Sequence, residues 1–195
     1  MPLRWPPLGV GYDAWMPPGA PRIRRARPEE LDTISKLLVR AYSEYAAAFP
    51  DGAAWSRYLS DVADVRGRWG RSSLVVAELD GVLAGSVDYY PPSSGGYTYP
   101  GVPFPSGWAM FRCLGTDPDR RGAGVGRTLV EHLIALARQD GAMHLAMHSA
   151  PTMATAVRMY QRMGFRRLPE HDFTPRPDAR LRVLAFGLAL DGLSP

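Results

Sequence analysis

Residues 114–136 restrict the fold of this chain more than any other stretch of the sequence. They read LGTDPDRRGAGVGRTLVEHLIAL, with three glycines among arginines directly after an apolar segment. From this loop onward, apolar residues recur at the spacing of one helix face. They are Val125, Leu129, Leu133 and Leu136. The stretch therefore predicts a strand, a glycine-rich loop and a helix, in that order.

A strand, a glycine-rich loop and a helix together form an anion-binding site. The first amide N–H groups of a helix have no intrahelical partner, and the helix dipole is positive at that end. Glycine lets the backbone approach a ligand closely. Arg120 and Arg121 can add charge-assisted hydrogen bonds to phosphate oxygens. We therefore expect the loop to bind a phosphate or a pyrophosphate.

The spacing of the glycines separates several phosphate-binding motifs. A Walker A loop requires a lysine that this loop lacks, and a dinucleotide fingerprint would need glycine where Arg127 stands. The pattern that is present is R-x-x-G-x-G, formed by Arg121, Gly124 and Gly126. Taken alone, this motif leaves open a simpler interpretation, in which the glycines only connect a strand to an ordinary helix.

Composition limits the class of protein. The 195 residues suffice for one domain, and 46% hydrophobic with 22% charged residues is ordinary for a globular chain. No apolar run approaches a membrane span, and the N-terminus does not resemble a secretory signal. The single cysteine, Cys113, fits a reducing compartment, so we expect a cytoplasmic protein without membrane contact. The net charge of +4 comes from scattered arginines, which makes nucleic-acid binding a weak alternative.

The positions of proline and glycine, together with the periodicity of apolar residues, divide the chain into one domain with two short extensions. Residues 1–21 are rich in proline and aromatics and predict an extended arm, which is compatible with a homodimer. Residues 22–190 form the domain, and residues 191–195 a tail. Strands are expected over residues 23–26, 74–79, 82–90, 108–114, 143–148, 165–168 and 180–190. Helices are expected from residue 28, over 55–62, from 125 to about 140, and over 151–163. The unit from 108 to 148 predicts two parallel neighbouring strands.

A second sequence motif lies at residues 156–165, after the glycine-rich loop. Ala156, Tyr160, Gly164 and Phe165 form the pattern A-x-x-x-Y-x-x-x-G-F. With the R-x-x-G-x-G loop and the order of elements over residues 22–190, this resembles the GNAT superfamily of N-acetyltransferases. The resemblance implies an α/β fold (α+β mixed sheet) that is splayed at the cofactor site and flanked by helices. It also implies acetyl-CoA as cosubstrate, no metal, and a small-molecule or peptide amine as acceptor.

The resemblance assigns site residues one by one. Backbone groups of Leu114, Gly115 and Thr116 would pair with the pantetheine arm of the cofactor and polarise its thioester. Tyr160 would contact the cofactor and act as general acid for the departing thiolate. The pyrophosphate would be held by Arg121, Gly122, Ala123, Gly124, Val125, Gly126 and Arg127. Met153 stands where many members carry asparagine, which weakens one expected contact.

The general base is not identified by the sequence. Met110 occupies the strand position where related sequences often carry an acid, and no carboxylate lies between residues 108 and 116. Asp88, Glu44, His148 and His171 all stay open as candidates. The missing strand acid leaves a second hypothesis for the whole chain, a non-catalytic acyl-CoA-binding or regulatory module.

Two further expectations concern side chains around the cleft. Cys113 is expected to act as a small buried hydrophobe rather than a nucleophile. The connections 91–107 and 169–177 are expected to border the acceptor. The aromatic candidates are Tyr89, Tyr90, Tyr97, Tyr99, Phe104 and Phe173, and the acidic candidates are Asp88, Glu170 and Asp172. The alternative, that these aromatics only anchor the loops to the domain, stays equally open.

Overall fold

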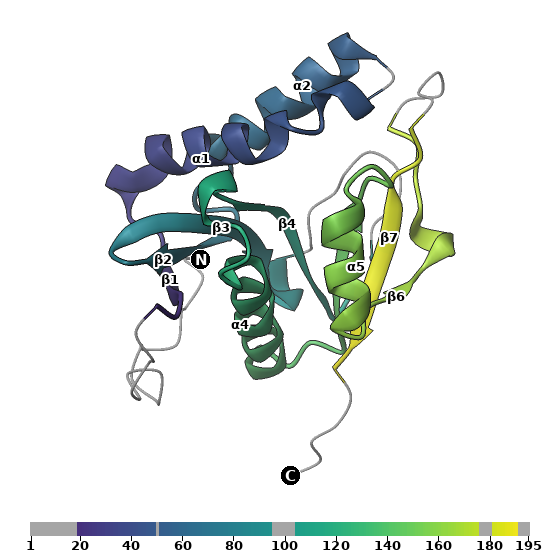
Figure 1. The fold of residues 1–195 in the computed structure, drawn as a ribbon. Coiled ribbons are helices and arrows are strands. Elements are labelled where there is room, and N and C mark those ends of the chain that lie inside the picture. Colours follow the sequence, from purple (N-terminus) through teal and green to yellow (C-terminus); the bar gives the residue numbers. More distant parts are fainter. Residues whose placement is uncertain (1–18, 50, 95–103, 176–180, 191–195) are drawn as a thin grey trace.

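The computed structural model describes residues 19–49, 51–94, 104–175 and 181–190 (Figure 1). Most of the expected N-terminal arm, the centre of the 91–107 connection and the C-terminal tail lie outside the described residues. The strands are β1 (Arg22–Arg25), β2 (Ser73–Leu79), β3 (Val82–Tyr90), β4 (Trp108–Thr116), β5 (His144–Ser149), β6 (Arg166–Arg167) and β7 (Leu184–Ala189). The α-helices are α1 (Leu31–Ser43), α2 (Gly52–Ala63), α3 (Val65–Arg68), α4 (Val125–Gln139) and α5 (Ala154–Arg162).

These strands form one mixed sheet with helices on both faces, which confirms the fold class expected from the sequence. The strand order is β1-β2-β3-β4-β5-β7-β6, and the β4–β5 pair is parallel as predicted. Helices α1 and α2 pack on one face with Val76 and Cys113. Helix α4 packs on the other face, with its predicted apolar stripe of Val125, Leu129 and Leu133 fully buried (Figure 1).

The parallel pair of strands β4 and β5 opens after a few residues. Trp108 to Met110 pair with His144 to Ala146, and no later described residue of β4 pairs with β5. Strand β4 continues for six further residues, to Thr116, still paired on its other side with β3. Figure 1 shows β4 leading towards α1 while β7 stays beside α5. The sheet is therefore split along the edge of β4 that faces β5.

Strand β4 also carries a bulge that the sequence did not reveal. Arg112 faces Asp88 of β3, whereas Gly115 faces Ser86, so β4 holds one extra residue over this interval. Cys113 within it has φ of 50°, a left-handed conformation that is uncommon for residues other than glycine. A bulge bends its strand and turns nearby side chains and amide groups to new directions. It lies where the strand leaves β5.

Several elements differ from the sequence-based expectations. The first α-helix begins at Leu31, after a 3-10 turn over Pro28–Glu30, and β6 spans two residues rather than four. The last helix, α5, begins at Ala154 rather than at 151, because the Met153 N–H bonds to the Ala150 carbonyl in a preceding turn. Helix α3 was not expected, since four residues are too few to show a helical period. The last strand begins at Leu184 rather than at 180; before it, Val183 forms only an isolated bridge with Phe173.

Candidate functional site

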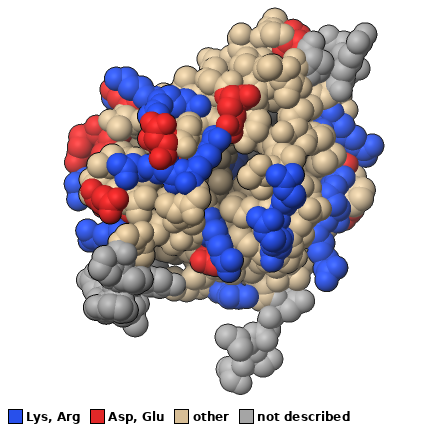
Figure 2. All heavy atoms as spheres, viewed as in Figure 1, with Lys and Arg blue, Asp and Glu red and all other residues tan. Residues whose placement is uncertain are grey.

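A cavity of about 1220 Å³ occupies the split in the sheet. Its walls come from β4 and β5, from α1 and α2 on one side, and from the start of α4 and α5 on the other. In Figure 2 a hollow lies near the centre of this face, with Lys and Arg side chains on both sides of it. Every residue assigned to cofactor binding lines the cavity except Ala123. The two sequence motifs, about 30 residues apart, therefore meet at one site.

The glycine-rich loop forms one end of the cavity. Gly122 and Gly124 have φ of 84° and 77°, and Gly124 is the N-cap residue of α4. A side chain at either position would meet no atom within 4 Å, so both glycines face open space. Gly126 instead lies beside the end of β4, where an added Cβ would stand 3.4 Å from Thr116 Cγ2. The loop thus presents bare backbone and a helix N-terminus to the cavity, as an anion site requires.

The arginines of this loop are held by carboxylates. Arg121 forms a two-pronged pair with Glu44 of the α1 C-cap, and Arg127 bonds to Glu131 at 2.7 Å on the same helix. Arg120 lies 3.6 Å from Asp80. All three arginines line the cavity. Since these pairs are partly exposed, each contributes little to stability, and a phosphate can replace the carboxylate as partner.

Tyr160 lies on α5. It belongs to the buried core and also lines the cavity. Its ring packs against Phe111 and Phe165 with centroids 5.7 Å apart in both cases. The side chain is buried, and this burial raises the pKa of the phenol well above its ordinary value. The phenol therefore stays protonated at neutral pH and is a hydrogen-bond donor at this wall.

The structure separates the four candidates for the general base. His148 and Glu44 line the cavity, whereas Asp88 and His171 do not. His148 Nε2 donates to the His171 carbonyl at 3.0 Å, and burial lowers the pKa of its imidazole. Burial alone would raise the pKa of Glu44, but hydrogen bonds from Arg121 and Tyr45 hold it below its usual value. Glu44 is thus an arginine-paired carboxylate at the phosphate end of the cavity.

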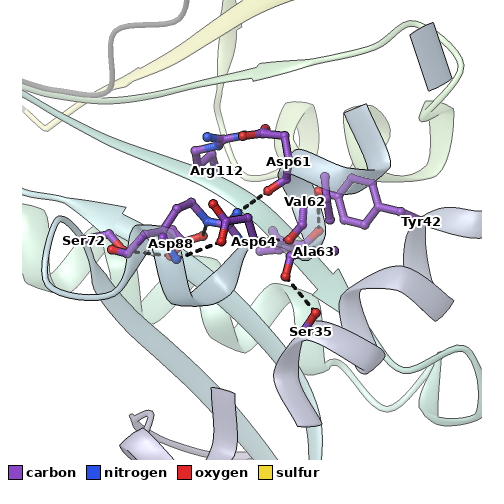
Figure 3. Close-up of polar contacts among 12 residues, drawn as sticks. Ser35, Tyr42, Asp61, Val62, Ala63, Asp64, Ser72, Asp88 and Arg112 are labelled. Carbon is purple, nitrogen blue, oxygen red and sulfur yellow. Dashed lines mark hydrogen bonds and ion pairs between the residues drawn. The ribbon is translucent and has the colours of Figure 1, made fainter. Parts of the chain in front are cut away.

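Asp88 belongs to a buried polar network instead of the cavity (Figure 3). Its carboxylate accepts bonds of 2.8 Å from Arg68 Nε and from Ser72 Oγ. Arg68 also donates to the backbone carbonyls of Asp61 and Val62 in the last turn of α2. Side-chain exposure is 7% for Arg68 and 1% for Asp88, so the ion pair is shielded from water. The network joins the end of α2 to strand β3.

A carboxylate that the sequence analysis missed lies at the cavity wall. Asp61 of α2 forms an ion pair with Arg112, which precedes the bulge of β4 (Figure 3). Both residues line the cavity. Asp61 belongs to a helical stripe at i, i+3, i+4 and i+7 that consists of Ala54, Arg57, Tyr58 and Asp61. That stripe, which lies beside the buried Trp55 and Val62 on the helix surface, was the available signal.

One of the two expected connections, 169–177, supplies part of the aromatic wall, and other elements supply the rest. Of the expected aromatics, Phe173 lines the cavity, whereas Tyr89, Tyr90 and Phe104 are buried elsewhere. The phenol of Tyr89 donates to Asp140, and Phe104 stacks on Trp108 and His148. Tyr97 and Tyr99 lie outside the described residues. The described part of the 91–107 connection is therefore anchored to the domain. The other cavity aromatics come from the α1–α2 region, from β4 and from α5: Tyr42, Tyr45, Phe49, Tyr58, Phe111 and Tyr160.

The acidic residues expected beside the acceptor are placed differently as well. Asp172 is held by Arg167 at 2.8 Å and by Arg182 at 3.1 Å. Neither Asp172 nor Glu170 is among the described residues that line the cavity. The acidic side chains at the wall are instead Glu44, Asp51 and Asp61.

The described part of the chain also bears on metal binding, on thiol chemistry and on membrane insertion. Within it, no three His, Cys, Asp or Glu side chains are placed to hold a metal ion. Burial raises the pKa of the Cys113 thiol to about 11, so the group is protonated and a poor nucleophile at neutral pH. Among the described helices, none combines the length and the apolar character needed to cross a bilayer.

Comparison with known proteins identifies relatives of both sequence and fold. The profile of the Acetyltransferase (GNAT) family matches residues 33–165, more than half of the chain. A streptothricin acetyltransferase from Streptomyces lavendulae is 44% identical over 48 residues, a match that covers 25% of this chain and 25% of that protein. The chain thus matches only a quarter of that relative's length.

Several solved structures share the fold at low sequence identity. A GCN5-related N-acetyltransferase from Rhodopseudomonas palustris has a TM-score of 0.64 at 19% identity, covering 90% of this chain and 99% of its own. The PaiA N-acetyltransferase from Thermoplasma acidophilum, solved with coenzyme A, has a TM-score of 0.64 at 12% identity, covering 85% and 98%. YncA from Salmonella typhimurium, solved with acetyl-CoA, has a TM-score of 0.60 at 19% identity, covering 90% and 97%.

Proposed function

Because the chain belongs to the Acetyltransferase (GNAT) family, we propose that it transfers the acetyl group of acetyl-CoA to an amine by direct attack. One observation carries this proposal. The β4–β5 pair opens after Met110, and the cavity in that opening is lined by the glycine-rich loop and by aromatic and acidic residues of the α1–α2 region. A cosubstrate with a phosphate end and a reactive thioester end fits such a cavity.

Strand β4 would bind the extended arm of the cosubstrate. Among the described residues, its edge facing β5 has no strand partner beyond Met110, so backbone groups there can form ladder-like hydrogen bonds. The Leu114 carbonyl already accepts a hydrogen bond of 3.2 Å from the Tyr42 hydroxyl. Leu114, Gly115 and Thr116 would pair with the pantetheine amides. An N–H group turned outward by the bulge at Cys113 would polarise the thioester carbonyl and hold the oxyanion of the tetrahedral intermediate.

The glycine-rich loop would hold the pyrophosphate. Backbone N–H groups from Gly122 to Gly126 supply uncharged donors, and Arg121 and Arg127 supply charge. Both arginines would exchange a carboxylate partner for a phosphate when the cosubstrate binds. Met153, which is buried and lines the cavity, supplies an apolar contact where many family members carry an amide.

Tyr160 is the proposed general acid. When the C–S bond breaks, the sulfur leaves with the electron pair, and a phenol at this wall can donate a hydrogen bond and then a proton to it. The phenol is protonated at neutral pH and so is in the donor form when the thiolate forms beside it, although burial raises its pKa and makes it a weaker acid than a free phenol. The proton lost by the amine nitrogen balances the proton gained by the sulfur.

The Tyr160→Phe variant tests this role. We expect kcat to fall roughly 10²-fold, because general acid catalysis typically contributes that much or more. The affinity for acetyl-CoA should change little, since phenylalanine keeps the contacts with Phe111 and Phe165. Initial rates of CoA release measure the first quantity and calorimetric titration the second. An unchanged kcat would remove Tyr160 from the chemistry.

Met110 favours a second function, that of a non-catalytic acyl-CoA-binding or regulatory module. This residue, which stands where an acid is common, is buried among Tyr90, Phe104 and Ala146 and cannot accept a proton. A protein that kept the cavity but lost its base would bind acyl-CoA without turnover. Tight binding of acetyl-CoA with no CoA release for any small-molecule or peptide amine would support this regulatory module over the enzyme.

A further inference from the structure

We propose that Asp61 binds the ammonium group of the acceptor and takes up its proton, an inference that rests on the proposed acetyl transfer. The acceptor class is then a primary amine that is protonated in water and carried on an apolar or aromatic body. Four features of the site carry this assignment: the position of Asp61, its access to the cavity, its fixed backbone and its aromatic neighbours.

Asp61 is linked through Arg112 to the strand that carries the expected reaction centre. Its carboxylate contacts the guanidinium of Arg112, and the next residue of β4, Cys113, forms the bulge where the thioester is expected to lie. Arg112 bonds to Oδ2, and the Asp61 side chain is 39% exposed at the cavity wall. A carboxylate in this position can meet a ligand and can return a proton to water.

The buried network fixes Asp61 relative to the sheet. Arg68 binds the backbone carbonyl of Asp61 and also the carboxylate of Asp88. Asp88 is in turn the cross-strand neighbour of Arg112. The backbone of Asp61 is therefore linked through Arg68 to Asp88. Arg112, which binds the Asp61 side chain, lies opposite Asp88 in the β3–β4 ladder. In this arrangement Arg68 and Asp88 are positioning residues that do not contact the acceptor.

The other two carboxylates of the cavity are less suited to the acceptor. Glu44 is bound by both terminal nitrogens of Arg121, close to the phosphate loop. Asp51 caps α2, where its Oδ1 accepts the Ala53 N–H at 2.9 Å. Both therefore have structural or cofactor-side roles, whereas the arginine that pairs with Asp61 belongs to β4 and precedes the bulge.

Aromatic rings next to Asp61 suit an amine with an apolar body. Tyr58 lies one turn before Asp61 on α2, and its ring stacks on Phe49 with centroids 5.8 Å apart and planes at 19°. Tyr42 packs edge-on against Tyr58 at 5.9 Å. Such faces attract cations as well as apolar groups. The ammonium would lie at Asp61 and the body of the acceptor along these rings.

The proton balance of the step is as follows. The ammonium nitrogen gives one proton to the Asp61 carboxylate, and the neutral amine then forms the C–N bond with the thioester carbon. When the C–S bond breaks, Tyr160 gives its proton to the sulfur, and the second proton of the nitrogen passes through water to the Tyr160 phenolate. Asp61 then returns its proton to water, so the products are the acetylated amine, CoA and one released proton.

The Asp61→Asn variant tests this inference with two amines of similar size, one strongly basic and one weakly basic and neutral at the assay pH. For the basic amine, kcat/KM should fall at least roughly 10²-fold. For the neutral amine the loss should be far smaller, because no ammonium must be bound or deprotonated. The Asp61→Glu variant should recover much of the activity. Acetyl-CoA affinity should stay near the parent value.

The Asp32→Asn variant is the matched control. Asp32 forms an exposed ion pair with Arg66 and does not line the cavity, so both amines should behave as with the parent. Equal losses for the two amines in Asp61→Asn, or rates equal to the parent, would overturn the role of Asp61. If the parent protein releases no CoA with any amine, the proposed function itself is contradicted. Thermal unfolding of each variant shows whether it is folded.

Discussion

The Gly126→Val protein should fold like the parent but bind acetyl-CoA at least roughly 10²-fold more weakly. Gly126 has an ordinary helical backbone, and an added Cβ would stand 3.4 Å from Thr116 Cγ2 and 3.6 Å from Met159 Sδ, which are tolerable contacts. The isopropyl group would nevertheless fill the space in which the pyrophosphate must approach the amides. Losing two charge-assisted hydrogen bonds of about 1.5–3 kcal/mol each accounts for a change of that size.

A valine at Gly52 is the control for this variant. Gly52 also lies in the first turn of a helix, α2, has no atom within 4 Å of an added Cβ, and does not line the cavity. Titration calorimetry with acetyl-CoA should give the parent affinity for Gly52→Val and a large loss for Gly126→Val. Equal affinity in the two variants would show that the loop does not hold the phosphates.

The Asp88→Asn protein should be destabilised by about 3–5 kcal/mol. The substitution keeps the shape of the side chain but leaves the buried guanidinium of Arg68 without its counter-charge, and removing one partner of a buried pair costs about this much. For a chain of this length the melting temperature should fall by roughly 6–20 °C. Calorimetric unfolding measures the change.

The exposed Asp32–Arg66 pair again supplies the control. Its side chains are 70% and 65% exposed, so Asp32→Asn should change the melting temperature far less than Asp88→Asn. If the two variants melt alike, the Arg68–Asp88 pair does not stabilise the fold as described. A normal melting temperature for Asp88→Asn would also weaken the claim that this pair fixes Asp61.

The parts of the fold that follow from local pattern could be predicted from the sequence. The spacing of Leu129 and Leu133 gave the buried face of α4, and Asp80-Gly81 gave the β2–β3 hairpin. The glycine-rich loop and the strand before it were predicted as neighbours, and both line the cavity. These features depend on residues close in sequence, and the observed structure contains each of them.

The features that were missed depend on contacts between distant residues. The bulge at Cys113 is defined by the register of β4 against β3, which no spacing within β4 reveals. Arg68 and Asp88 are 20 residues apart on different elements, and Asp61 and Arg112 are 51 apart. Local composition was misleading for Tyr89 and Phe104, because both aromatics pack in the core rather than at the cavity.

Release of CoA from acetyl-CoA, measured with a panel of amines, tests the central proposal most directly. The full chain is incubated with acetyl-CoA and each small-molecule or peptide amine, and free thiol and acetylated product are quantified together. The proposal predicts equal amounts of thiol and N-acetyl product, fastest with basic amines on aromatic or apolar bodies, and strongly reduced rates in Tyr160→Phe and Gly126→Val. Tight binding of acetyl-CoA without product from any amine would contradict it.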